Sequence, residues 1–242
     1  MADHSTLTPP RTYARVVGAL YALIFILGPF AFFLGRPGIV VPGDPAATVG
    51  KLMASEMMFR LGITAETVIV LVEIAVSALL YLLLRPVSRP LALASVLARF
   101  AQSVLQAVNL FTAVPALLLL GGASYLSSFT ADQLNALVML SMNVNAFMIL
   151  IWGLIFGFHL LLLGYLVYKS GFWPRILGIL LLVAAVGYLA QSWGHILVPQ
   201  YDELLARVVV ILSIPGELAF TLWLLIKGVD TERWQERARQ ST

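Results

Sequence analysis

The chain has 242 residues, of which 60% are hydrophobic and 11% charged, and its mean hydropathy is +0.94. Soluble domains carry about 25% charged residues, so this composition excludes an ordinary soluble domain and predicts a polytopic membrane protein. The net charge of +3 does not indicate a nucleic-acid partner, because the basic residues stand at the ends of apolar runs rather than along one stripe. The absence of cysteine excludes disulfides, thiolate metal sites and cysteine nucleophiles.

The long apolar runs predict an all-α transmembrane bundle, because a hydrocarbon core about 30 Å thick requires about 20 apolar residues per helix. Six spans are expected, at residues 14–35, 61–84, 91–119, 135–168, 175–197 and 206–227. Within this scheme, residues 1–12 form a disordered N-terminus, residues 13–228 the transmembrane domain and residues 229–242 a charged tail. The first run lacks a small-residue cleavage site, which indicates an anchor that is not removed.

The positive charges beside the spans predict the orientation. Ten flank one side of the membrane and four the other, so the positive-inside rule places both termini in the cytoplasm. Six spans, an even number, agree with two ends on one side. The ten are Arg11, Arg15, Arg85, Arg89, Lys169, Arg175, Lys227, Arg233, Arg237 and Arg239, and the four are Arg36, Lys51, Arg60 and Arg207.

A short helix is expected on the outer surface between the first two spans, near residues 45–58. Asp44 has the character of an N-cap, and Pro45 follows at the first helical position, where proline is favoured. The helix is therefore predicted to run from Ala46 to Met58 and to lie in the interface.

Four spans each place one ionisable residue at a similar depth. Counted from the nearest cytoplasmic charge at 1.5 Å per residue, these residues lie about 15 to 18 Å above the cytoplasmic face, which is near the midplane. They are Glu73, Arg99, His159 and Glu217. Ionisable groups inside a membrane face a partner or a water-filled cavity, so the four are expected to converge as the floor of a cavity.

The charges of these four residues do not balance. Glu73, Arg99 and Glu217 left unpaired would together cost on the order of 8 to 10 kcal/mol, so mutual pairing is expected. Two glutamates against one arginine leave one negative charge. A protonated carboxyl, a cationic His159 or a bound cationic ligand would compensate it.

Further polar residues continue these helix faces toward the outside. Arg99, Gln102, Gln106 and Asn109 follow a spacing that places them on one stripe. The expected vestibule of an outward-facing cavity consists of Glu66, Gln102, Gln106, Asn109, Gln191 and His195. The alternative is structural, since interhelical hydrogen bonds between polar side chains hold membrane bundles together at about 0.6 kcal/mol each.

Metal and cofactor chemistry is not predicted. A zinc site needs three ligands, and His159 and His195 differ in depth by about 15 Å on the same count, so they are not expected to share an ion. The sequence contains neither a Walker A motif nor a dinucleotide fingerprint, so no cofactor is expected.

Several segments resemble the bacterial membrane family catalogued as domain of unknown function 4386. They are residues 55–63 (SEMMFRLGI), 80–94 (LYLLLRPVSRPLALA), 98–109 (ARFAQSVLQAVN), the run from His159 through KSGFWPRILGILL to Tyr188, and 216–229 (GELAFTLWLLIKGV). The resemblance covers most of residues 45–229. It implies a multi-pass protein of the bacterial plasma membrane and brings no activity, substrate or catalytic residue.

Three functions fit these observations. The first is binding or transport of a small molecule or ion through the outward-facing cavity, and the second is an intramembrane enzyme that acts on a lipid or isoprenoid through Glu or His acid–base chemistry. The third is a non-catalytic accessory or regulatory subunit. Because no catalytic signature is present, a non-enzymatic function is favoured. The expected partners are the lipid bilayer and a small-molecule, ion or lipid ligand; the sequence does not predict the oligomeric state.

Overall fold

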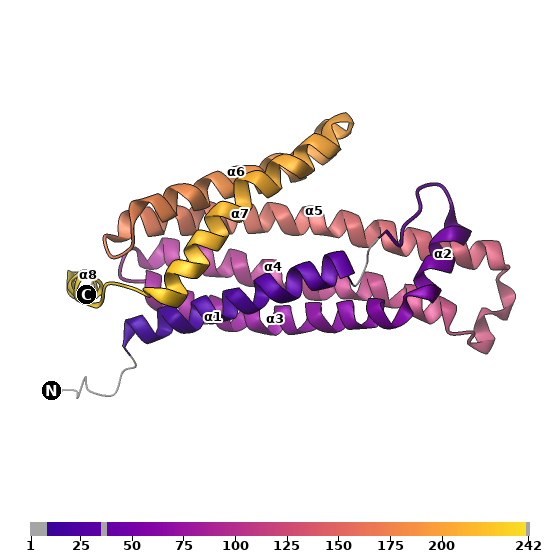
Figure 1. The fold of residues 1–242 in the computed structure, drawn as a ribbon, viewed down its shortest axis with the longest axis horizontal. Helices are drawn as coiled ribbons and strands as arrows, with labels where there is room; N and C mark the ends of the chain where they lie inside the picture. The colour runs from indigo at the N-terminus through magenta and orange to yellow at the C-terminus, as the bar shows by residue number, and fades with distance from the viewer. Residues whose placement is uncertain (1–8, 35–37, 241–242) are drawn as a thin grey trace. The chain divides into compact units, whose positions relative to one another are not determined.

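The computed structural model describes residues 9–34 and 38–240, which are almost entirely helical (Figure 1). The α-helices are α1 (Pro10–Pro29), α2 (Pro45–Ala54), α3 (Glu56–Leu84), α4 (Arg89–Leu120), α5 (Ala131–Ser170), α6 (Arg175–Leu197), α7 (Asp202–Ile226) and α8 (Thr231–Gln240). Shorter turns follow α1 (η2, Phe30–Leu34) and α4 (η3, Ser124–Ser128) and join α6 to α7 (η4, Pro199–Tyr201). No strand occurs among these described residues, which confirms the all-α prediction.

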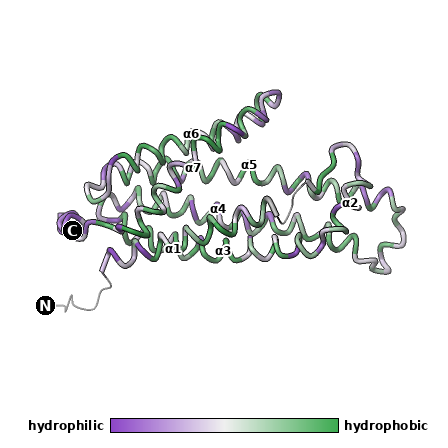
Figure 2. Tube along the Cα trace, in the orientation of Figure 1, coloured by the Kyte–Doolittle hydropathy of each residue, from purple (hydrophilic) through white to green (hydrophobic). Residues whose placement is uncertain are grey.

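Within the part of the chain that the structure describes, six helices are long and apolar enough to cross a membrane, which confirms the predicted number of spans. They are α1 with the start of η2, α3, α4, α5, α6, and α7 with η4. Figure 2 shows the apolar character continuing along these helices, while α8 and the turn between α6 and α7 are hydrophilic. At 40 residues, α5 is about twice the length that a bilayer requires, so it must tilt or protrude.

The N-terminal helix begins earlier and ends differently from the prediction. Residues 1–8 of the segment expected to be disordered lie outside the described residues, but α1 already begins at Pro10. Regular α-helix ends at Pro29, and the next five residues form a π-helical turn. Proline has no N–H to donate within the helix, which accounts for the change in hydrogen-bond pattern at this point.

The chain divides into two compact units. Unit 1 consists of residues 1–23, 72–102 and 153–242, and unit 2 of residues 24–71 and 103–152. The three longest helices, α3, α4 and α5, contribute one half to each unit.

In unit 2, the predicted short helix is present as α2. The Asp44 side chain accepts a hydrogen bond from the Ala47 N–H at 2.9 Å, and Pro45 is the first helical residue. The helix ends at Ala54, so the predicted end at Met58 is wrong: residues 56–58 are the first turn of α3. The apolar core of unit 2 contains Ile39, Val49, Leu52, Phe59, Ala113, Ala116, Val138 and Met142.

In unit 1, glycines allow three helix pairs to approach closely. A Cβ atom added to Gly18 of α1 would lie 2.3 Å from the main-chain nitrogen of Leu225 in α7. Gly216 of α7 contacts the carbonyl of Leu180 in α6, and Gly178 of α6 contacts the main chain of α5 in the same way. Small residues at such crossings let backbones pack together, which is a main source of helix association in membranes.

We expect Gly18→Ala to destabilise the protein by about 1–3 kcal/mol, because the added methyl group would meet main-chain atoms of α7 that cannot rotate away. Gly28→Ala on the same helix is the matched control, since nothing lies within 4 Å of a Cβ at that position. Thermal unfolding of the detergent-purified chain measures both. Equal melting temperatures for the two variants would contradict the close α1–α7 contact.

Candidate functional site

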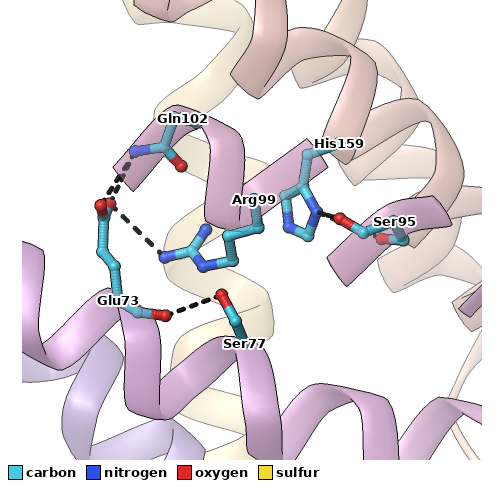
Figure 3. Close-up of polar contacts among 6 residues, drawn as sticks. All are labelled: Glu73, Ser77, Ser95, Arg99, Gln102 and His159. Carbon is cyan, nitrogen blue, oxygen red and sulfur yellow. Dashed lines mark hydrogen bonds and ion pairs between the residues drawn. The ribbon is translucent and has the colours of Figure 1, made fainter. Parts of the chain in front are cut away.

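The most polar part of the interior of unit 1 lies between α3 and α4. Glu73, Arg99 and Gln102 are each at most 2% exposed. The Gln102 amide donates to both carboxylate oxygens of Glu73, at 2.9 and 3.0 Å, and the Arg99 guanidinium lies 3.7 Å from the same carboxylate (Figure 3). Residues three apart on a helix share a face, so α4 presents Arg99 and Gln102 together to the single carboxylate on α3.

Aromatic rings from two other helices enclose the arginine. The Arg99 guanidinium carbon lies 4.9 Å from the ring centre of Tyr21 in α1 and 5.7 Å from that of Phe156 in α5. A cation over an aromatic face is attracted by the ring, by about 2 kcal/mol or more when the pair is desolvated. Tyr21 is also within electrostatic range of Glu73 and Glu217. The sequence did not indicate Tyr21, because one tyrosine in an apolar span resembles ordinary packing.

His159 of α5 is fully buried, and its hydrogen-bond partner is Ser95 of α4 rather than Glu73, Arg99 or Glu217. Its Nδ1 lies 2.8 Å from the Ser95 carbonyl and 3.1 Å from the Ser95 hydroxyl, and its ring stacks on Phe156. A carbonyl only accepts, so Nδ1 carries the proton. The other ring nitrogen, Nε2, is an acceptor in neutral histidine, and it is buried without a hydrogen-bond partner among the described residues.

Glu217 of α7 is half-buried and accepts a hydrogen bond of 3.1 Å from the Tyr188 hydroxyl of α6. The Tyr188 ring packs edge-on against Phe156, with 5.0 Å between ring centres. Arg99 lies within electrostatic range of Glu217. Phe156 therefore lies between the histidine, the arginine and the tyrosine that holds the second carboxylate.

The structure thus places all four predicted floor residues in unit 1, where Glu73 and Arg99 form an ion pair. Glu73 pairs with Arg99, while His159 and Glu217 are held by Ser95 and Tyr188, which the sequence reasoning had not assigned to the floor. Gln102, which is predicted in the vestibule, donates hydrogen bonds to Glu73. Its carbonyl oxygen Oε1 is buried without a hydrogen-bond partner among the described residues, as is His159 Nε2.

The cluster is closed in this conformation. Glu73 and Arg99 are 2% exposed and His159 is 0% exposed. Four surface pockets on the described part of the chain are lined by other residues and include none of Glu73, Arg99, His159 and Glu217. The outward-facing cavity above these residues therefore stays a prediction.

Three of the predicted vestibule residues lie in unit 2, where they are buried. Glu66 is 2% exposed, Asn109 6% and Gln106 9%. The Asn109 amide donates to the Asn145 carbonyl at 3.2 Å, and the Asn145 amide returns bonds to Asn109 and to the Thr112 hydroxyl. Ser141 donates to the Thr112 carbonyl in the same network. This reciprocal bonding joins α4 to α5 and matches the structural alternative for these amides.

The remaining two vestibule residues lie on α6 in unit 1. Gln191 is half-buried. His195, in the last turn of α6, pairs with Asp202 at the start of α7, with 2.7 Å between Nδ1 and the carboxylate. His195 therefore lies at the turn between α6 and α7. Across the described residues, no three His, Asp or Glu side chains gather closely enough to hold a metal ion.

Comparison with known proteins identifies a family without assigning an activity. The model of the family described as "Domain of unknown function (DUF4386)" matches residues 16–228. An uncharacterised protein from Archaeoglobus fulgidus is 32% identical over 166 residues, which cover 66% of this chain and 79% of the relative. No solved structure is significantly similar to the chain. Because this relative is archaeal, the match does not support the bacterial origin that the resemblance implied.

Arg99→Met should destabilise the protein by about 3–5 kcal/mol, because it leaves the Glu73 carboxylate buried without its cation. The double variant Glu73→Leu/Arg99→Met should recover most of this loss, since no buried charge of the pair then remains. The free energy of unfolding in detergent, measured for the two single variants and the double variant, gives the coupling energy.

Arg60→Met provides the matched control, because Arg60 and Glu56 form an ion pair of 2.7 Å on the exposed surface of α3. Its expected cost is only about 0.3–0.5 kcal/mol. Purely additive effects at Glu73 and Arg99 would show that the buried pair is not coupled.

Proposed function

The chain belongs to the DUF4386 family, and we propose that it is an integral membrane protein that binds a small cation, or a small molecule with a cationic donor group, at the buried cluster of Glu73, Arg99, Gln102, His159 and Glu217. The observation that carries this proposal is that the cluster contains two carboxylates, those of Glu73 and Glu217, but one cation, Arg99. The proposed ligand supplies the missing positive charge and hydrogen-bond donors.

The charge argument starts from the two carboxylates. Among the described residues, Arg99 is the only basic residue that forms an ion pair with either of them, and its partner is Glu73. Glu217 has a neutral partner, the Tyr188 hydroxyl. An ionised pair of carboxylates would therefore leave one negative charge in an apolar surrounding, which costs about 2.5–3.5 kcal/mol on insertion scales. A proton or a bound cation removes this cost.

The hydrogen-bond argument points the same way. Gln102 Oε1 and His159 Nε2 both require a donor, and both are buried without one among the described residues. The assignment of the Gln102 amide is fixed by chemistry, since its nitrogen faces two carboxylate oxygens that only accept. An unsatisfied buried acceptor costs about 1–3 kcal/mol, so a ligand that donates to these atoms gains binding energy.

Transport follows from binding if the closed cluster opens. Because Glu73, Arg99 and His159 are buried, a ligand that reaches them must exchange through a change of conformation rather than through a permanent pore. We propose that the opening leads to the outer surface and that Gln191, on the same unit, lies toward it. A structural role as an accessory subunit is the second candidate, favoured by the complete pairing of the Glu73 carboxylate.

Glu217→Gln separates the two candidates, because the amide can still accept from Tyr188 but carries no charge. Cation binding predicts that this variant is more stable than the wild type in cation-poor buffer, by on the order of 1–3 kcal/mol, and is indifferent to added cations. The measurement is the melting temperature of the purified chain with sodium, potassium, ammonium or methylammonium chloride, and across a pH series.

Glu203→Gln, on the exposed first turn of α7, is the control for a change in net charge. The cation proposal fails if the wild type responds to none of the four cations nor to pH while Glu217→Gln remains folded. A less stable Glu217→Gln variant would support the structural candidate.

We further propose that the protein resides in the plasma membrane with both termini in the cytoplasm, as the distribution of basic residues predicts. Because the chain contains no cysteine, single cysteines can report sidedness without background labelling. In intact cells, a membrane-impermeant maleimide should label Ser128→Cys, between α4 and α5, but not Gln240→Cys, at the end of α8. The reverse pattern would contradict the orientation.

A further inference from the structure

A second polar site lies in unit 1, apart from the buried cluster. It is a pocket of about 570 Å³ bounded by the start of α1, the turn between α5 and α6, the end of α7 and the start of α8. Three cationic side chains line it, Arg11, Lys227 and Arg233, together with the indoles of Trp173 and Trp223. None of the residues that carry the proposed function lines this pocket.

The pocket lies where apolar spans end. Lys227 directly follows the last residue of α7, and Arg11 is the second residue of α1. Both helices are long and apolar enough to cross a membrane. Tryptophan and basic residues at the ends of such spans are typical of the headgroup region, where phospholipid phosphates lie. The position of the pocket therefore matches the depth of a lipid headgroup.

Two of the three cations are available to a ligand. Lys227 and Arg11 are exposed, and neither makes an ion pair with a described residue. Arg233 is engaged by Asp230 at 3.4 Å and donates to the Gly171 carbonyl. Asp230 also accepts from the Arg233 N–H, so this carboxylate is used in capping α8. Glu232 also lines the pocket, so three basic residues stand against two acidic ones, and the remaining positive charge favours an anion.

The structure also holds the wall of the pocket in place. The Trp173 indole donates to the Gly228 carbonyl at 3.0 Å. Gly228 has φ +72°, and a Cβ there would lie 2.9 Å from Cγ of Arg11, so the arginine stem packs directly on this glycine. On the far side, the Trp234 indole donates to the Leu83 carbonyl and ties α8 to α3. Arg11 is thus directed by packing, which lowers the entropy lost when it binds an anion.

We propose that this pocket binds the phosphate headgroup of an anionic phospholipid, with Arg11 and Lys227 as the main ligands of the phosphate. Paired cations recognise a phosphate by charge-assisted hydrogen bonds, and the half-buried Trp223 indole contacts the glycerol and upper acyl region. Zwitterionic lipids carry their own cation and gain less from the same pocket. A soluble phosphate would satisfy the same cations but would gain nothing from the surrounding bilayer.

The test compares lipid binding by the purified full-length chain in detergent. Phosphatidylglycerol, phosphatidylcholine and inorganic phosphate are added separately, and the melting temperature and native mass spectra are recorded. Phosphatidylglycerol should stabilise the wild type more than phosphatidylcholine. In Arg11→Gln/Lys227→Gln, its affinity should fall about 30-fold, since each basic group near an anionic surface contributes a factor of about five.

The control Arg60→Gln/Arg207→Gln removes the same charge from two exposed residues that pair with glutamates on their own helices. It should retain the preference for phosphatidylglycerol, as should the conservative variant Arg11→Lys/Lys227→Arg. Equal stabilisation by the two lipids, or an undiminished preference in Arg11→Gln/Lys227→Gln, would overturn the proposal. If inorganic phosphate stabilised the wild type as much as phosphatidylglycerol does, and this effect were lost in Arg11→Gln/Lys227→Gln, the ligand would be a free phosphate and not a lipid headgroup.

Discussion

The interior of unit 1 depends on one constraint: a charge inside an apolar bundle must have a partner. Arg99 is among the largest fully buried side chains and meets this constraint through three helices at once. Glu73 supplies the opposite charge, and the rings of Tyr21 and Phe156 cover the guanidinium. Because α1, α3, α4 and α5 all contribute to this surrounding, the arginine links helices that are far apart in the sequence, and their packing also sets the places of His159 and Glu217.

The same constraint explains why two kinds of polar residue behave differently. The amides of Asn109 and Asn145 satisfy each other across α4 and α5, so their network is complete without a ligand. Around Arg99, by contrast, two buried acceptors, Gln102 Oε1 and His159 Nε2, have no hydrogen-bond partner among the described residues. A bundle stabilised only by packing does not need such acceptors, because neutral hydrogen bonds and small residues suffice to join helices. The cluster in unit 1 is the candidate site because it combines such acceptors with the buried ion pair of Glu73 and Arg99.

At the end of unit 1 that carries α8, tryptophan side chains form hydrogen bonds between segments that are far apart in the sequence. Trp173 bonds to the linker before α8, and Trp234 of α8 bonds to the last turn of α3. The charged tail therefore contains a helix, α8, that is docked on α3. Its Trp234 indole donates to the Leu83 carbonyl, one of the last carbonyls of α3, which have no N–H partner within their own helix. Three of the basic residues that marked the membrane edge in the sequence, Arg11, Lys227 and Arg233, line one pocket there.

The sequence alone determined the class of the protein, the six spans and the identities of the buried ionisable residues, because span length and the cost of intramembrane charge are properties of local composition. Helical spacing also predicted that Arg99 and Gln102 share a face. The partners were decided only by tertiary structure. Tyr21, Ser95 and Tyr188 look like ordinary residues in their own helices, and they acquire their contacts with Arg99, His159 and Glu217 from the packing of other helices against them. Side-chain direction and the rotation of each helix about its axis are not encoded by any single segment. They also made Gln102 a hydrogen-bond donor to Glu73 and placed His195 beside Asp202.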